Sequence, residues 1–541
     1  MQGVSNFRTT FIRGLKGAAA GLLAGYTALA VAELVASLAR PEAGPVTVVG
    51  GAAIDRTPAA VKDFAIRTFG ESDKLVLQLG ILATLGLLAV ALGLLSLRYR
   101  RTGAAGVLLF GVIGAAAALT RPDTQGPVDA LPSLVGALAG AAILYLLAGR
   151  IVSVAGPEPL AGPDTAAGPE PVAGGRQGRW SRRGFLAAAS VTAVAATGLG
   201  ALGRTLSGRR GQGAVASREG LKLPAPASPA PALPAGVQLK AQGISSFTTP
   251  NKDFYRVDTA LVVPKVDADT WRLRIHGKGV ARPRTYTLQD LLERPLIERD
   301  ITLTCVSNEV GGPYIGHARW LGVRLADLLR ECGVKPPSKG GPADQLVARS
   351  VDGMALGSPV EDVMDGRDAI LAVGMNGEPL PFDHGFPVRM LVPGLYGYVS
   401  ACKWIKDLEL TTFDAYDAYW VKRKWARKAP IKTQARIDTP KPFARPAAGA
   451  VVVAGVAWAQ HRGIDRVEVR IDDGPWQDAD LAPQAGIDTW RQWSFPWKAA
   501  AGGHTLTVRA TDGTGAVQTE ERARTVPDGA SGWHSVFVTA G

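Results

Sequence analysis

The chain has 541 residues, which is too long for one hydrophobic core and predicts about three or four structural units. Its formal net charge is +13, but the basic residues cluster at the ends of apolar segments or are dispersed among acids, which argues against a nucleic-acid-binding protein. The three cysteines, Cys305, Cys332 and Cys402, have the spacing of neither a disulfide framework nor a zinc site.

Four apolar segments open the chain, at 17–39, 75–97, 103–120 and 130–148. Each is close to the length at which a helix spans the hydrocarbon of a bilayer, so residues 1–155 are predicted to form a four-helix transmembrane region surrounded by lipid. Basic residues lie before the first segment, between the second and third, and after the fourth: Arg8, Arg13, Lys16, Arg98, Arg100, Arg101 and Arg150. Since basic loops stay in the cytoplasm, we expect a multi-pass protein of the cytoplasmic (cell) membrane with its N-terminus inside.

Glu33 is the one acidic residue well inside an apolar span, which makes it a candidate functional group by default. It also lies near the outer end of its span, where its carboxylate would reach the membrane interface, and we favour that interpretation. The spans are rich in Ala and Gly and contain few polar side chains, so an anchoring role is a simpler interpretation than a transporter.

A Pro/Gly-rich stretch at 156–180 has too little apolar side-chain bulk to bury and is predicted to be a cytoplasmic linker. Residues 181–203 begin with Ser181-Arg182-Arg183-Gly184-Phe185-Leu186 and continue as an apolar run, which resembles a twin-arginine export signal placed inside the chain. The alternative is an ordinary fifth transmembrane helix with basic flanks, and both interpretations put the remaining residues outside the cytoplasm. The Pro-rich segment at 204–243 predicts an extended extracytoplasmic linker.

From about residue 244 the sequence changes to short β-rich runs with one helical stretch at 321–331, which predicts a mixed α+β domain at 244–430. Alternating strands separated by Asp-Gly, Gly-Gly and Pro turns follow at 431–541 and predict an immunoglobulin-like β-sandwich. The predicted fold is therefore multi-domain: an α-helical membrane region, an α+β domain and an all-β sandwich.

Two segments carry a resemblance to a known family. Thr302-Leu303-Thr304-Cys305-Val306-Ser307-Asn308 resembles the cysteine segment of the sulfite oxidase family, and Pro381-Phe382-Asp383-His384-Gly385-Phe386-Pro387-Val388-Arg389 resembles its pterin-binding region. The resemblance covers roughly 245 to 541 and implies a molybdopterin-dependent oxidoreductase, here in a membrane-anchored bacterial, actinobacterial-like form. It implies that Cys305 ligates molybdenum as a thiolate, that His384 and Arg389 bind the pterin, and that 431–541 forms a homodimer.

The same resemblance extends to residues outside these two segments. It implies cofactor contacts by four of them: Asn251, Tyr255, Arg256 and Ser350. Lys403 lies where the family has a lysine near the pterin or the substrate anion, so we assign it to both the catalytic and the cofactor-binding residues. Tyr416 is our candidate for a catalytic tyrosine that donates a hydrogen bond to an oxo ligand, with Tyr419 as the alternative.

The implied reaction is oxygen-atom transfer on a small sulfur-containing substrate, either oxidation of an oxyanion such as sulfite or reduction of a sulfoxide. Sulfite oxidases follow the ligand cysteine closely with arginines, whereas here Asn308 is followed by Glu309 and Val310, and a carboxylate opposes sulfite. Another cation, for example Arg319, could supply the lost charge. The alternative function is a non-catalytic, membrane-tethered module for binding or envelope organisation on the same fold.

The supply of electrons is constrained by where histidine and cysteine occur. All six histidines lie at residue 276 or later, and no cysteine precedes Cys305. A membrane haem needs axial ligands, usually histidine, so we expect neither a haem nor an iron–sulfur cluster in this chain. The electron partner is therefore predicted to be separate: a cytochrome, a quinone or a membrane redox protein.

Overall fold

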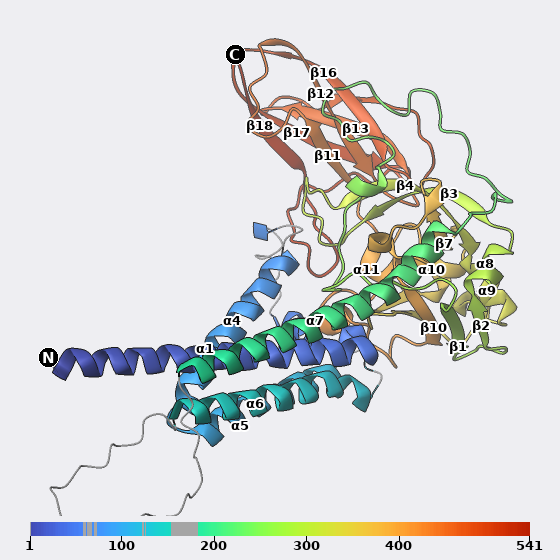
Figure 1. The fold of residues 1–541 in the computed structure, drawn as a ribbon. Coiled ribbons are helices and arrows are strands. Elements are labelled where there is room, and N and C mark those ends of the chain that lie inside the picture. The colour runs from blue at the N-terminus through green and yellow to red at the C-terminus, as the bar shows by residue number, and fades with distance from the viewer. Residues whose placement is uncertain are drawn as a thin grey trace, which may run out of the picture. The chain divides into compact units, whose positions relative to one another are not determined.

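The computed structural model describes residues 2–57, 73–121, 126–152 and 182–541, together with 61, 68, 69 and 124. The predicted linker at 156–180 lies outside the described residues, and so do Ser181 and the side chains of Arg182 and Arg183. The chain divides into two compact units, Met1–Gln212 with Thr259–Val262 and Gly213–Asp258 with Val263–Gly541. The first unit is helical and the second consists mostly of strands (Figure 1).

The helices of the N-terminal unit are α1 (Gln2–Leu38), α2 (Pro45–Arg56), α4 (Asp73–Ser96), α5 (Arg100–Leu119), α6 (Leu131–Val152) and most of α7 (Arg182–Glu219). Five helices in the described part of the chain are long and apolar enough to cross a membrane. They coincide with the four predicted apolar segments and with the segment predicted as a twin-arginine-like signal or, alternatively, a fifth transmembrane helix, which confirms the helical N-terminal region; the export signal stays a prediction. The sequence analysis did not predict α2, because two adjacent glycines interrupt its short apolar pattern.

Small residues bring the helices of this unit into close contact. A Cβ at Gly21 of α1 would collide with the backbone of Ala89 on α4, and a Cβ at Gly136 of α6 would collide with the backbone of Ala28 on α1. Close backbone approach is the usual way in which helices pack in lipid, where burial of apolar side chains gives little driving force.

The first part of the second unit has two sheets around one hydrophobic core, a mixed sheet and an antiparallel one. One sheet has the order β2 (Arg284–Thr287), β1 (Arg272–Gly277), β10 (Ile405–Thr411), β5 (Gln345–Ser350) and β6 (Ala355–Pro359). The other has the order β3 (Ile297–Thr304), β4 (Ile315–Arg324), β7 (Ile370–Met375) and β8 (Glu378–Pro379), and β9 (Arg389–Leu391) pairs with β7. Short helices connect the strands: α8 (Leu288–Leu292), α9 (Leu325–Glu331), α10 (Val360–Met364) and α11 (Gly397–Ser400).

The helical stretch predicted at 321–331 is only partly a helix. Helix α9 begins at Leu325, because Leu321–Arg324 belong to β4 and pair with β7. The apolar residues of this segment are buried in both conformations, so their pattern did not distinguish a strand end from a helix start.

Two antiparallel four-stranded sheets form the C-terminal part of the chain. The first sheet has the order β11 (Gln434–Thr439), β12 (Gly449–Trp458), β16 (Arg491–Ala499) and β15 (Asp480–Leu481). The second sheet has the order β14 (Gln477–Asp478), β13 (Ile464–Ile471), β17 (Gly502–Asp512) and β18 (His534–Ala540). Alternate residues of β16, namely Trp493, Phe495 and Trp497, enter a core shared with Val467 and Val508 of the other sheet. This confirms the predicted β-rich region, and the immunoglobulin class stays a prediction.

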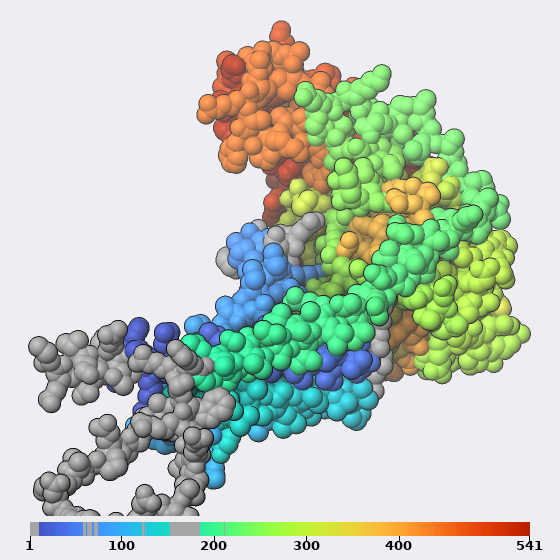
Figure 2. All heavy atoms as spheres, in the orientation of Figure 1, coloured from blue at the N-terminus to red at the C-terminus, as the bar shows by residue number. Residues whose placement is uncertain are grey.

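The Pro-rich segment differs from the extended linker predicted at 204–243. Helix α7 continues to Glu219, and the residues after it lie along the second unit (Figures 1 and 2). Ser228 forms a bridge with Ile297 at the start of β3, and the amide of Ala230 donates to Glu298 Oε2 over 3.2 Å. The segment therefore follows the edge of a sheet, because its free backbone groups find partners there.

Candidate functional site

Cys305 lies in a tight loop between β3 and β4. Its amide donates to the carbonyl of Tyr314 over 3.0 Å, and its carbonyl accepts from the amide of Asn308 over 3.0 Å. The side chain of Asn308 closes the loop by accepting from the amide of Tyr314 at 2.7 Å. Burial raises the pKa of the Cys305 thiol, and hydrogen bonding by Ser307 and the charge of Lys403 act in the opposite direction. The loop thus presents a half-buried thiol that a bound metal ion would keep deprotonated.

Arg389 on β9 is a buried cation with unused hydrogen-bonding capacity. It is 6% exposed, its guanidinium lies 5.4 Å from the ring centre of Trp320, and Nη1 donates to the carbonyl of His384 over a long 3.4 Å. Nε has no hydrogen-bond partner among the described residues. Burial lowers the pKa of Arg389 to about 10. A buried guanidinium with an unpaired donor is suited to an anionic ligand such as a phosphate.

His384 stands at the end of a short 3-10 turn, Phe382–His384, and is 4% exposed. Its Nε2 donates to the carbonyl of Asn251 at 3.0 Å, so Nδ1 is left as an acceptor. Burial and the charge of Arg389 lower the pKa of His384 to about 4, which keeps the imidazole neutral near pH 7. The turn needs glycine at Gly385, where φ is +112° and a Cβ would lie 3.1 Å from Lys403 Cα.

Lys403 is held by a carboxylate that the sequence analysis did not identify. Its Nζ donates to Asp258 Oδ2 at 2.6 Å and to the carbonyl of Asp383 at 3.1 Å. Asp258 Oδ2 also accepts from Arg256 Nε at 2.9 Å, and Arg256 Nη1 pairs with Asp383 Oδ1 at 3.0 Å. Burial lowers the pKa of Lys403 to about 8, although Asp258 opposes this change. The sequence signal, an Asp two residues after Arg256, was too general to be noticed.

Two tyrosines lie in the electrostatic surroundings of Cys305. Burial and the charge of Cys305 raise the pKa of Tyr255, whose ring centre is 6.3 Å from that of Tyr314. Burial also raises the pKa of Tyr396, and the charge of Cys305 adds a smaller effect in the same direction. The charge of Arg389 has the opposite effect and lowers the pKa of Tyr255. Tyr255 therefore responds to the charges of both the thiol and the buried guanidinium.

Tyr416 is not brought to this group. Its ring lies between Arg349 and Lys422, at 5.4 and 5.2 Å, and no contact joins it to Cys305 within the part of the chain that the structure describes. The ring of Tyr419 lies 3.5 Å from the guanidinium of Arg423. Tyr255 is therefore a further candidate tyrosine, because the charge of Cys305 acts on it, and the catalytic role of Tyr416 stays a prediction. The path of the chain after β10 depends on long-range packing, which local sequence does not reveal.

Ser350 and Asn251 have different surroundings from those expected of cofactor contacts. Ser350 is 2% exposed and donates to the carboxylate of Asp352, while the next amide donates to the carbonyl of Trp404. The side-chain Nδ2 of Asn251 donates to Glu378 Oε1 at 2.8 Å, and only its backbone carbonyl contacts His384. The backbone carbonyl of Asn251 thus positions the imidazole, and the amide of Val351, next to Ser350, holds the segment that carries Lys403.

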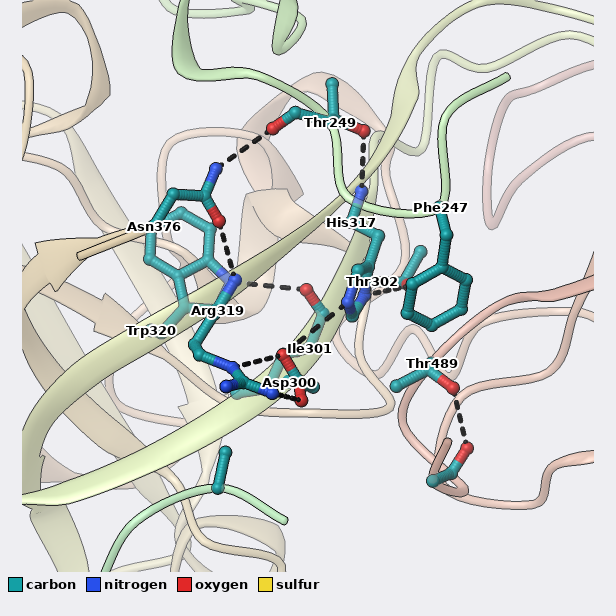
Figure 3. A network of polar contacts seen from close by, with 12 residues as sticks. Phe247, Thr249, Asp300, Ile301, Thr302, His317, Arg319, Trp320, Asn376 and Thr489 are labelled. Carbon is teal, nitrogen blue, oxygen red and sulfur yellow. Dashed lines mark hydrogen bonds and ion pairs between the residues drawn. The ribbon is translucent and has the colours of Figure 1, made fainter. Parts of the chain in front are cut away.

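A buried polar network lies beside the strand that leads to Cys305 (Figure 3). His317 is fully buried, its Nδ1 is 3.1 Å from Thr302 Oγ1, and Thr302 Oγ1 accepts from the amide of Trp490 at 2.8 Å. These contacts join β3 and β4 to the loop before β16. Thr302 is three residues before Cys305, so the C-terminal sheets help to fix the position of the thiol.

The network continues from β4 towards His384. Arg319 forms two hydrogen bonds with Asp300, at 3.0 and 2.7 Å, and its amide donates to Asn376 Oδ1 at 2.9 Å (Figure 3). The side-chain Nδ2 of Asn376 in turn donates to Asn251 Oδ1 at 2.8 Å. Arg319 is therefore committed to Asp300 and does not supply a free charge for a substrate anion.

The described residues contain no group of three or more His, Cys, Asp and Glu side chains that could hold a metal ion.

Residues 260–420 match the family model of the oxidoreductase molybdopterin-binding domain. Sulfite oxidase of Gallus gallus is 31% identical over 301 residues, covering 47% of this chain and 64% of the relative. The mitochondrial sulfite oxidase of Rattus norvegicus is 30% identical over 291 residues, covering 46% and 53%.

The chain thus spans less than two thirds of the length of these curated relatives. Among solved structures, the sulfane dehydrogenase SoxCD of Paracoccus pantotrophus matches with 26% identity and a TM-score of 0.48, covering 55% of this chain and 82% of that chain. The family model covers the segment that carries Cys305, His384 and Arg389. Residues 260–420 therefore match a molybdopterin-binding oxidoreductase domain, and the curated relatives to which this chain is similar are sulfite oxidases.

Proposed function

We propose that residues 244–541 use a molybdenum cofactor to transfer an oxygen atom to or from a small sulfur-containing substrate. The observation that carries this proposal is the buried guanidinium of Arg389, whose Nε lacks a partner among the described residues, in the domain that also holds the Cys305 thiol; the charges of both act on Tyr255. The membrane-anchored bacterial form is part of the proposal. The helical N-terminus would cross the cytoplasmic membrane from the inside and hold the domain outside.

The residues of the site fit the cofactor that the domain type implies. Arg389 Nε is a buried donor that lacks a partner among the described residues, and a phosphate or pterin acceptor would satisfy it. His384 offers Nδ1 as an acceptor for a ring N–H. Cys305 offers a soft sulfur ligand. When bound, molybdenum supplies two-electron oxygen-transfer chemistry, and the chain's own groups hold the cofactor and set the charge around it.

The charges near Cys305 favour a weakly charged substrate. Lys403 and Arg256 are the nearby cations, but Asp258 pairs with both of them and Asp383 pairs with Arg256. Glu309, four residues after the thiol, adds a further negative charge. A sulfoxide needs less positive potential than sulfite, so we favour sulfoxide reduction over sulfite oxidation. We further propose that the domain exchanges electrons with a separate partner. We also propose that the chain forms a homodimer through residues 431–541.

Variants of the full-length protein at Cys305 test this function. Cys305→Ser should abolish both methionine sulfoxide reduction with a reduced viologen dye and sulfite oxidation with an artificial acceptor, while membrane insertion stays intact. Cys332→Ser is the matched control, because Cys332 is fully buried beside Tyr286, away from the site. Substantial turnover by Cys305→Ser would exclude the proposed role and favour the non-catalytic, membrane-tethered module.

A further inference from the structure

The C-terminal sheets contact the loop that carries Cys305 at both of its ends. The near end follows β3, and there Gln460, two residues after β12, reaches the backbone of this strand. Its Nε2 donates to the carbonyl of Thr302 at 3.0 Å and to Thr304 Oγ1 at 2.9 Å. Gln460 is fully buried, so water does not compete for these bonds. Because Thr304 directly precedes Cys305, Gln460 fixes the backbone from which the thiol projects.

Arg436 on β11 holds the far end of the same loop. Its Nη1 donates to the carbonyl of Gly312 at 2.8 Å, while Nε and Nη2 donate to Asp438 Oδ1 at 2.7 Å and to Ser245 Oγ at 3.0 Å. Asp438 is buried as well, and its other oxygen accepts from the amide of Ser245 at 2.9 Å. All three nitrogens of this buried guanidinium are therefore in use, which fixes the direction from which it binds the loop.

His534 on β18 lies against the same end of the loop. Its Nδ1 accepts from the amide of Ile437 at 3.0 Å, which fixes the orientation of the ring. Gly311 packs on this ring, since a Cβ there would lie 2.3 Å from His534 Nε2, and its φ of +80° also favours glycine. The imidazole therefore blocks movement of the loop towards the C-terminal sheets, and the hydrogen bond from Arg436 opposes movement away from them.

We propose that Gln460 and Arg436 are positioning residues for Cys305: from the C-terminal sheets they set the direction in which the thiol leaves its loop and how far solvent reaches it. The loop is closed between these two contacts, because the amide of Gly312 donates to the carbonyl of Glu309 at 2.8 Å. The same contacts thus hold the segment that carries the Glu309 carboxylate. The inference rests on the proposed function only where the thiol is taken to be a metal ligand.

Alkylation of the Cys305 thiol with iodoacetamide tests this positioning in full-length protein from a host that makes no molybdopterin. Gln460→Met and Arg436→Lys should each raise the alkylation rate about three- to tenfold, because each variant loses hydrogen bonds that keep the loop closed. A lysine at 436 still balances the charge of Asp438 but cannot bind all three partners at once. Burial raises the pKa of the Cys305 thiol, so a loosened loop should lower this pKa and move the onset of alkylation to lower pH.

Two matched variants control for the loss of buried hydrogen bonds elsewhere in the C-terminal sheets. Gln518 is 4% exposed, and its side chain bonds to backbone groups of these sheets at 2.9 and 3.1 Å. Arg509 donates to Glu468 at 2.8 and 3.1 Å. Neither Gln518→Met nor Arg509→Lys should change the alkylation rate of Cys305.

The other two cysteines report on folding in the same samples, because Cys332 and Cys402 are 0% and 1% exposed. Equal Cys305 rates in the wild type, Gln460→Met and Arg436→Lys would overturn the proposal. So would parallel increases at all three cysteines, which would show that these contacts serve only stability. Molybdenum content is measured separately, on protein matured in a molybdopterin-producing host. Wild-type protein without molybdenum that still shows the selective alkylation differences would refute the proposed function and leave the positioning role in place.

Discussion

Replacing Arg389 with methionine should have opposite effects on cofactor retention and on the stability of the cofactor-free protein. The guanidinium is 6% exposed, and its Nε lacks a partner among the described residues. Burial lowers its pKa from 12.5 to about 10, which corresponds to about 3 kcal/mol of unfavourable free energy for the charged form. The contact with Trp320 at 5.4 Å returns about 1–2 kcal/mol of this. Arg389→Met should therefore stabilise the cofactor-free protein by about 1–2 kcal/mol.

The measurement is chemical denaturation of cofactor-free, full-length protein, followed by tryptophan fluorescence. Eleven of the twelve tryptophans lie between Trp271 and Trp533, so the signal reports on the second unit. The same variant, produced in a molybdopterin-synthesising host, should contain little molybdenum. Arg330→Met is the control, because Arg330 is exposed and pairs with Asp327 on the surface. A destabilised Arg389→Met variant that retains molybdenum would refute the reasoning and make Arg389 a structural residue.

Two further predictions concern Lys403 and the buried network around Thr302. Asp258→Asn removes the carboxylate that raises the pKa of Lys403, so this pKa should fall below its value of about 8. A lysine carries its charge only below its pKa, so activity that needs the charged ammonium of Lys403 should be lost at a lower pH in the variant than in the wild type. The measurement is the pH profile of kcat/KM, and an unchanged alkaline limb would contradict the prediction. Thr302→Val removes the contacts of Oγ1 with His317 and with the amide of Trp490 and should cost about 1–3 kcal/mol in denaturant unfolding. Thr285→Val, at an exposed strand position, should cost much less, and equal losses would argue against the buried network.

The sequence predicted the helices better than it predicted their ends. Apolar runs of membrane length identify α1, α4, α5, α6 and α7, because a helix must satisfy its backbone in hydrocarbon. Helix α7 nevertheless extends 16 residues beyond the predicted end at 203, to Glu219. The added part contains helix-forming Ala and Arg residues that an analysis of hydropathy alone ignores. The Pro-rich segment was assigned to an extended linker because composition does not reveal the sheet edge to which it binds.

The candidate site was predictable where its residues belong to local motifs. Cys305, His384, Arg389 and Lys403 came from two short segments and the residues that follow them, and electrostatic coupling or hydrogen bonds join them in the structure. Asp258, Tyr396 and His317 were missed, because nothing in their neighbouring sequence distinguishes them from ordinary structural residues. Tyr416 was chosen on its position in the chain, and the structure places its ring between two cations on another part of the domain.

The most direct test of the account is the molybdenum and pterin content of the purified full-length protein, matured in a molybdopterin-producing host, beside its Cys305→Ser variant. The account predicts one molybdenum and one pterin for each wild-type chain, and X-ray absorption at the molybdenum edge should show one sulfur neighbour fewer in the variant. Folded wild-type protein without molybdenum, from a host that loads a control sulfite oxidase, would contradict the central claim and make the non-catalytic module the leading interpretation.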